Sequence, residues 1–213
     1  MKFALNMVSL RGGGGKRIAQ NFLKFLLTES VEKFVVAIPL ECGYEKIITK
    51  TNRFVPIYKD KKMSSLNRFV FDQFSLPSAI KKGKSQALFS LNNLSSFLME
   101  MPHVLLFHHA HFVYPESSVF KKLTASELIR KKIEIRIFIE TIKNCNTIIV
   151  QTPVMRERLI ENFRKYLEHT DIVILPNTPF PLNGYTPTFY CRSFPAEPIW
   201  FIPTQYYPHK NLE

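Results

Sequence analysis

The chain has 213 residues, of which 46% are apolar and 13% aromatic, and its 29 Lys and Arg residues against 17 Asp and Glu residues give a formal net charge of +12. This length and apolar content exclude a disordered chain and suffice for one sizeable core. No run approaches the ~20 apolar residues that span a bilayer. Three irregularly spaced cysteines argue against a disulfide framework or a zinc site and fit a reducing compartment. The charge favours nucleic acid, an anionic membrane or a phosphate-bearing substrate as partners.

Short apolar runs alternate with helical segments along the chain. The runs expected to form strands are residues 3–10, 34–38, 53–57, 86–90, 104–107, 147–150 and 172–175. Apolar residues at helical spacing predict helices over residues 16–27 and 125–142. Thr152 before Pro153 predicts an N-cap and a helix that continues to Tyr166. This alternation predicts an α/β domain over residues 1–175, with a Rossmann-like parallel sheet flanked by helices.

A glycine-rich segment, residues 11–16, lies between the first strand and the first helix expected from the pattern. Gly13, Gly14 and Gly15 leave backbone N–H groups accessible to an anion, and the following helix directs its positive end to the same place. The segment lacks the third glycine of the dinucleotide fingerprint and the Ser or Thr of a P-loop. A flexible turn therefore remains the alternative to a phosphate site.

Three histidines, His108, His109 and His111, directly follow the apolar run at residues 104–107. Such a group is consistent with a metal site, a proton-transfer site or a polar loop whose histidines cap strand ends. No carboxylate or cysteine lies beside them in sequence, so we expect no metal site here.

The last part of the chain differs in composition from the rest. Residues 176–198 are rich in proline, aromatic residues and threonine and have no periodic pattern, so we expect a linker between domains. Residues 199–213 begin with the apolar run Trp200-Phe201-Ile202 and continue with the composition of a loop that opens a helix. We expect a second domain to begin there.

The terminal sequence Tyr207-Pro208-His209-Lys210-Asn211-Leu212-Glu213 resembles the first loop of the donor-binding domain in retaining glycosyltransferases of family 4, the group 1 enzymes with the GT-B architecture. Further segments occur in the order of that family: the glycine-rich segment, the histidine loop, the strand end at Gln151-Thr152 and the loop at Pro176-Asn177. The chain resembles the N-terminal, acceptor-side domain of this family followed by the start of its donor domain.

The resemblance implies transfer of a hexosyl group from a nucleotide sugar to an acceptor hydroxyl with retention, without a metal or other cofactor. The residues implied for the site are Gly13, Gly14, Gly15 and Lys210 at the donor diphosphate and His108 and His111 near the transferred sugar. One departure is Gln205, which stands where the family has a basic residue that helps to hold the phosphates. The acidic pair of the donor domain is expected beyond Glu213, so we expect this chain alone to be inactive.

The expected partners are a nucleotide sugar, a glycan or lipid-linked acceptor and the missing C-terminal donor domain. We expect a cytoplasmic protein, and the charge suggests peripheral contact with an anionic membrane on its inner face. Nucleic acid is not expected as a partner.

Two other interpretations remain open. One is a basic module that binds nucleic acid or a membrane surface without catalysis, for which Phe69, Phe71 and Phe74 beside Arg68 are the only interleaved aromatic and basic residues. The other is an inactive, truncated relic of the enzyme.

Overall fold

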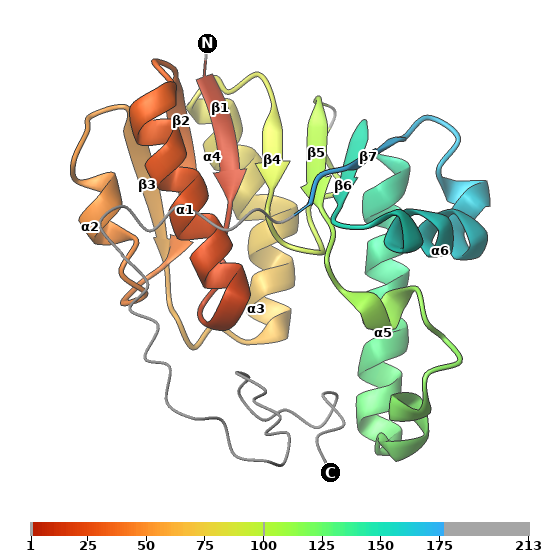
Figure 1. Cartoon of the computed structure of the whole chain (residues 1–213). Helices are drawn as coiled ribbons and strands as arrows, with labels where there is room; N and C mark the ends of the chain where they lie inside the picture. The colour runs from red at the N-terminus through yellow and green to blue at the C-terminus, as the bar shows by residue number, and fades with distance from the viewer. Residues whose placement is uncertain (1, 100, 177–213) are drawn as a thin grey trace, which may run out of the picture.

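The computed structural model describes residues 2–99 and 101–176, which form a seven-stranded sheet flanked by helices (Figure 1). The strands are β1 (Lys2–Asn6), β2 (Lys33–Pro39), β3 (Phe54–Lys59), β4 (Leu88–Ser90), β5 (His103–Leu106), β6 (Thr147–Val150) and β7 (Asp171–Ile174). All neighbouring strands are parallel, in the order β3-β2-β1-β4-β5-β6-β7. The predicted α/β, Rossmann-like fold is therefore confirmed.

Helices cover both faces of the sheet. One face carries α1 (Gly13–Glu29) and α2 (Glu45–Ile48), and the other carries α3 (Ser65–Val70), the π-helix η1 (Phe71–Ser75), α4 (Leu76–Lys82), α5 (Ala125–Lys143) and α6 (Pro153–Phe163). The described residues also form three short 3₁₀ helices, η2 (Ala110–Phe112), η3 (Ser118–Lys122) and η4 (Arg164–Tyr166). Alternation along β1 shows the division, because Leu5 packs in the core with Leu23 of α1, whereas Ala4 packs with Ile80 of α4.

The strand order reverses between β1 and β4. The chain proceeds from β1 to β2 and β3 on one side, then returns to place β4 on the other side of β1. Open α/β sheets bind ligands outside the carboxyl ends of their strands at such a switch point. The loops that follow β1 and β4, residues 7–12 and 91–98, flank this point and position the candidate site.

The first strand is shorter than the predicted run of residues 3–10. It ends at Asn6, whose side-chain amide donates to Asp72 Oδ1 at 2.9 Å. Met7 and Val8 stay buried, but the backbone turns there, and Leu10 N donates to Met7 O at 3.0 Å. The apolar pattern therefore extended beyond the strand because a buried turn has the same composition as a buried strand.

The glycine-rich segment is also placed differently from the prediction. Helix α1 begins at Gly13 instead of residue 16, so Gly13, Gly14 and Gly15 form its first turn and are not part of the preceding loop. The predicted helix 153–166 is α-helical to Phe163 and continues as η4, and the Thr152 hydroxyl accepts from Met155 N as its predicted cap.

Residues 65–82 form three consecutive helical elements that the apolar pattern did not indicate. The Ser64 side chain accepts from Asn67 N at the start of α3. Two polar residues, Asp72 and Gln73, are buried in the π-helical turn η1. Their inward orientation breaks the apolar periodicity, and the wider π-turn shifts its phase.

The other predictions for the end of the chain lie outside the described residues. These are the interdomain segment 176–198 apart from its first residue, the start of a second domain at 199–213, and Lys210.

His103, at the start of β5, should make the stability of the protein depend on pH. It is buried, with Nε2 3.4 Å from Ser90 Oγ and Nδ1 3.5 Å from Cys145 Sγ. Burial lowers its pKa to about 4, so the folded protein holds a neutral ring that the unfolded chain protonates below pH ~6.5. The free energy of unfolding should therefore fall by on the order of 3 kcal/mol as the pH falls from about 6.5 to about 4.

Urea unfolding of the wild-type and His103→Gln proteins at pH 7 and pH 4.5 measures this contribution. The variant should lose less stability on acidification than the wild type by about that amount. An identical loss in both proteins would show that His103 is not the responsible group.

Candidate functional site

The first turn of α1 presents backbone N–H groups at the carboxyl edge of the sheet. Its N-cap, Gly12, has no side chain to accept from them, and the turn contains no acidic residue. A Cβ atom built at Gly12, Gly13 or Gly14 would meet no atom of the described residues within 4 Å. Gly13 has φ of +60°, a conformation that other residues rarely adopt. This turn therefore combines the positive end of a 17-residue helix with open space in front of it.

Two consecutive asparagines connect the loop after β4 to its neighbours. Asn92 Oδ1 accepts from Ser9 Oγ at 2.5 Å, which links this loop to the one after β1. Asn93 Oδ1 accepts from the backbone N–H of His108 at 2.8 Å, which links it to the end of β5. The three loops at the switch point thus form one hydrogen-bonded group.

The contacts of Asn93 also indicate which ring nitrogen of His108 carries the proton. Because Asn93 Oδ1 faces the His108 backbone N–H, the amide Nδ2 faces the ring, 3.4 Å from Nε2. Burial lowers the pKa of His108, so its ring is neutral at pH 7. We infer that Nε2 accepts from Asn93 and that Nδ1 carries the proton. His108 is then a hydrogen-bond donor at Nδ1 and is not poised as a cation.

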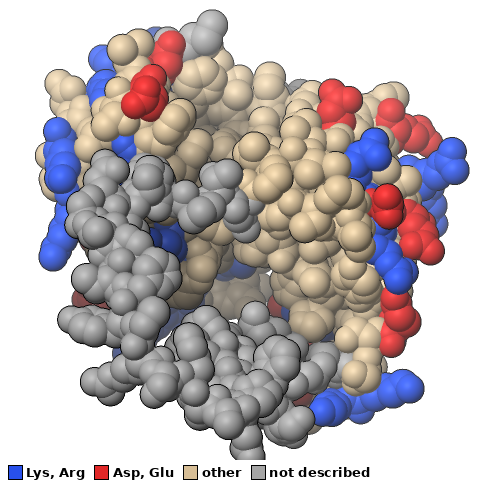
Figure 2. All heavy atoms as spheres, viewed as in Figure 1, with Lys and Arg blue, Asp and Glu red and all other residues tan. Residues whose placement is uncertain are grey.

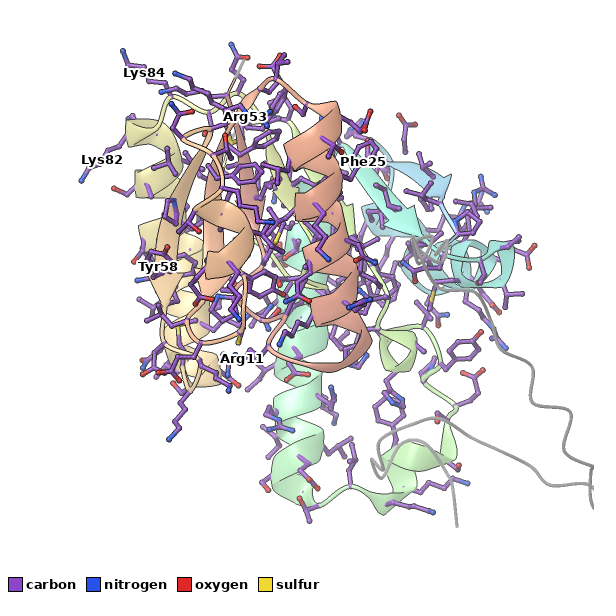
Figure 3. All side chains as sticks on the ribbon, turned by 60° about the vertical axis from the view of Figure 1, so that its left-hand side comes forward. Arg11, Phe25, Arg53, Tyr58, Lys82 and Lys84 are labelled. Carbon is purple, nitrogen blue, oxygen red and sulfur yellow. The ribbon has the colours of Figure 1, made fainter. Side chains whose placement is uncertain are left out.

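Three buried donor nitrogens on these loops have no hydrogen-bond partner among the described residues: Arg11 Nε, Asn92 Nδ2 and His108 Nδ1. Arg11 keeps one contact, from Nη2 to Met63 O at 3.0 Å. Figure 3 shows Arg11 at the end of the sheet where the strands terminate. Two further buried atoms without a partner among the described residues, Arg53 Nη1 and Ser85 Oγ, precede β3 and β4 at the other end of the sheet. Buried donors without partners are costly and rare, so the three on the loops at the carboxyl edge indicate a place for acceptor oxygens.

The two other histidines of the cluster face a different environment. The His109 ring stacks on Phe112 at 4.5 Å, and Lys131 Nζ lies 3.3 Å from His109 Nε2. His111 lies in η2, with its ring 6.3 Å from that of Phe120. The structure therefore brings His108 into contact with the switch-point loops, whereas His111 packs toward η3.

Charge is distributed over several parts of the surface. Lys82 and Lys84 lie at the opposite end of the sheet from Arg11 (Figure 3). Figure 2 shows Lys and Arg mainly toward the margins of one face, with Asp and Glu among them on the right-hand side. A further basic cluster, Lys59, Lys61 and Lys62, begins at the last residue of β3 and so lies at the same edge of the sheet as the candidate site. Lys59 Nζ lies 4.7 Å from the centre of the Phe71 ring.

The stretch proposed for a stacking platform is divided between core and surface. Phe71 is buried, Phe69 is half-buried against Phe97, and Phe74 is exposed. These three rings therefore do not form a common exposed surface on which bases could stack.

The sequence indicated the glycines and His108 but not Arg11, Asn92 or Asn93 as site residues. An Asn-Asn pair directly after a short apolar strand was the available signal, because polar side chains there reach the functional edge. Within residues 2–99 and 101–176, no three His, Cys, Asp or Glu side chains are grouped to hold a metal ion. The buried cysteines Cys42 and Cys145 are both free thiols.

Comparisons with protein-family models, with curated proteins and with solved structures found no match to this chain. In the part of the chain that the structure describes, no helix has the length and apolar character needed to cross a membrane.

The first turn of α1 provides a matched pair of substitutions. Gly13→Ala should lower the free energy of unfolding by about 1 kcal/mol or more, because alanine is strained at φ of +60°. Gly14→Ala should raise it by up to about 1 kcal/mol, because the site is open and alanine favours a helix. Chemical unfolding of both variants measures the two effects, and effects of the same sign would contradict this backbone geometry.

The tautomer of His108 can be measured directly. Long-range ¹H–¹⁵N spectra of the imidazoles at pH 7 should show a protonated Nδ1 and an unprotonated Nε2 for His108, with assignment by a His108→Gln variant. Asn93→Ala should shift His108 toward the tautomer protonated at Nε2, because Nε2 then loses the amide donor of Asn93. Asn144→Ala, which removes an exposed contact to Glu140 O, is the matched control. A protonated Nε2 in the wild type would overturn the assignment.

Proposed function

We propose that this chain is the acceptor-side half of a retaining GT-B glycosyltransferase and that its switch-point edge faces the diphosphate of a nucleotide sugar. The observation that carries the proposal is the set of buried donors at Arg11, Asn92 and His108, on the loops after β1, β4 and β5, that have no partner among the described residues. The first turn of α1 adds backbone N–H groups at the same edge of the sheet. The reaction class is proposed from the order of the sequence motifs, which resembles that of the family 4 glycosyltransferases.

A diphosphate suits this edge for electrostatic reasons. The backbone N–H groups of Gly13, Gly14 and Gly15 lie at the positive end of α1, and no acidic residue in that turn competes for them. Arg11 adds a cation from the same loop. Fixed donors that face the departing diphosphate would stabilise the charge that develops on it as the bond to the sugar breaks. In this proposal Lys210 adds a second cation from the donor side.

His108 acts in this proposal as a donor to the sugar. A neutral ring with its proton at Nδ1 can donate to a hydroxyl oxygen but cannot accept a proton at that atom. The Asn93 side chain holds His108 in place, because its Oδ1 accepts from the His108 backbone N–H and its Nδ2 faces the ring Nε2. The direction of the Nδ1 donor is therefore set before a ligand arrives. His108 therefore orients the transferred sugar, while the edge of the sheet binds the leaving group.

The test uses the full chain and inorganic pyrophosphate, the part common to all nucleoside diphosphates. Titration should shift the amide resonances of the first turn of α1 in a saturable way. Gly14→Glu should weaken binding by about tenfold or more, because a carboxylate then occupies the position of the anion and repels it. Gly14→Gln, of the same size without charge, is the control and should bind nearly as well as the wild type.

A second comparison separates a glycosyltransferase from a general polyanion binder. Nucleotide sugars should bind more tightly than the corresponding nucleoside diphosphates, and His108→Phe should remove this difference while pyrophosphate binding remains. If single-stranded RNA bound with a steep salt dependence and the Gly14→Glu variant bound it equally well, the basic binding module would replace the proposal. Absence of pyrophosphate binding would also overturn it.

A further inference from the structure

A cavity lies on the sheet face that carries α3 and α5. It has a volume of about 470 Å³ and is walled by α3 and η1 on one side, α5 on the other, and Leu94 and Ser95 of the loop after β4 between them. This size is within the range of small-molecule sites. Asn92 and Asn93 of the same loop contact Ser9 and His108 at the switch point, so the loop separates the cavity from the candidate diphosphate site.

The walls of this cavity are mainly apolar. Leu66 and Phe69 contribute from α3, Leu94 from the loop, and Ile133 and Ile137 from α5. Leu66 is 70% exposed and Ile133 is 55% exposed, so apolar side chains also border the opening. Large apolar side chains that line an open cavity favour an apolar ligand, because its entry removes both surfaces from water.

The two basic residues at the cavity, Arg68 and Arg130, are balanced by the two acidic residues Asp72 and Glu134, so a preference for an anion rests on Arg130. Glu134 lies 2.7 Å from Lys131 Nζ but 3.9 Å from Arg130 Nε, so its carboxylate is engaged mainly by the lysine. The Arg130 side chain is 59% exposed and can reach a further anion.

The other acidic group at the cavity, Asp72, already has two partners. Its Oδ1 accepts from Asn6, and its Oδ2 lies 3.4 Å from Arg68 Nε. Both of its oxygens are therefore engaged within the protein, which limits repulsion of an entering anion.

We infer that this cavity binds the aliphatic chain of an anionic amphiphile, a single-chain carboxylate or a chemically similar lipid. The chain lies between Phe69 and Ile137, and the head group meets Arg130 at the opening. A nucleotide would leave its polar atoms against apolar walls, and a volume of about 470 Å³ favours one aliphatic chain over a protein helix. This binding requires neither a nucleotide sugar nor transfer, so it stands independently of the proposed function.

The experiment titrates the full chain with decanoate below its micelle concentration and follows isoleucine methyl resonances. The methyl groups of Ile133 and Ile137 should shift in a saturable way. Ile129 lies one turn earlier on α5, is 60% exposed and does not line the cavity, so its resonance should move little. Decyltrimethylammonium, with the same chain and the opposite charge, should bind more weakly.

Two variants test the chain and the head group separately. Ile133→Trp fills the cavity and should weaken decanoate binding by about tenfold or more. The indole takes up space that the aliphatic chain would occupy, so several methylene groups of decanoate stay exposed to water. Ile129→Trp is the matched control and should change binding by less than about twofold. Arg130→Gln should weaken decanoate binding and leave decanol binding unchanged.

Three results would overturn the inference: no saturable shift, equal affinity for the cationic probe, or equal loss of binding in the two tryptophan variants. The last would indicate adsorption on exposed apolar surface. Should Ile133→Trp fail to fold, Arg130→Gln at an exposed position still decides the head-group contact. Pyrophosphate binding should persist in every variant, which distinguishes failure of this inference from failure of the proposed function.

Discussion

The loop after β4 is the connection on which the rest of the functional edge depends. Its side chains and backbone contact the loop after β1, the end of β5, the π-helical turn η1 and helix α5. Ser95 O, for example, accepts from Gln73 Nε2 at 3.2 Å and from Thr141 Oγ1 at 3.1 Å. These groups are buried, so each lost partner would leave a desolvated polar atom. The polar network therefore holds the two halves of the sheet in one arrangement at the switch point.

The π-helical turn explains how this network reaches the other face of the sheet. It places two consecutive polar side chains, Asp72 and Gln73, in buried positions, where Asp72 accepts from Asn6 at the end of β1 and Gln73 binds the loop after β4. Burial raises the pKa of Asp72, and the contacts to Arg68 and Asn6 oppose that rise. The switch-point edge and the apolar cavity thus share one supporting structure while presenting opposite chemistry, with hydrogen-bond donors on one side and apolar walls on the other.

The sequence predicted most elements but fewer of the site residues. Strand β6 has the predicted bounds because a run of four apolar or β-branched residues ends at polar neighbours on both sides. Helix α5 follows its apolar stripe and begins at a capping box between Thr124 and Glu127. The apolar pattern was less informative in residues 65–82, where buried polar residues interrupt it. It was also less informative at Met7 and Val8, where a buried turn has the same apolar composition as a strand.

By itself the sequence determined the alternation of strands and helices, and hence a parallel α/β sheet, because apolar spacing and caps act within one element. It also placed the glycines and His108 next to strand ends. Only the tertiary structure decided which side chains meet there. Asn6 and Asp72 are 66 positions apart and Ser9 and Asn92 are 83 apart, so local pattern carries no information about either pair. Their partners are set by how strands align and helices pack, since a buried polar atom takes whatever donor or acceptor that packing brings within reach.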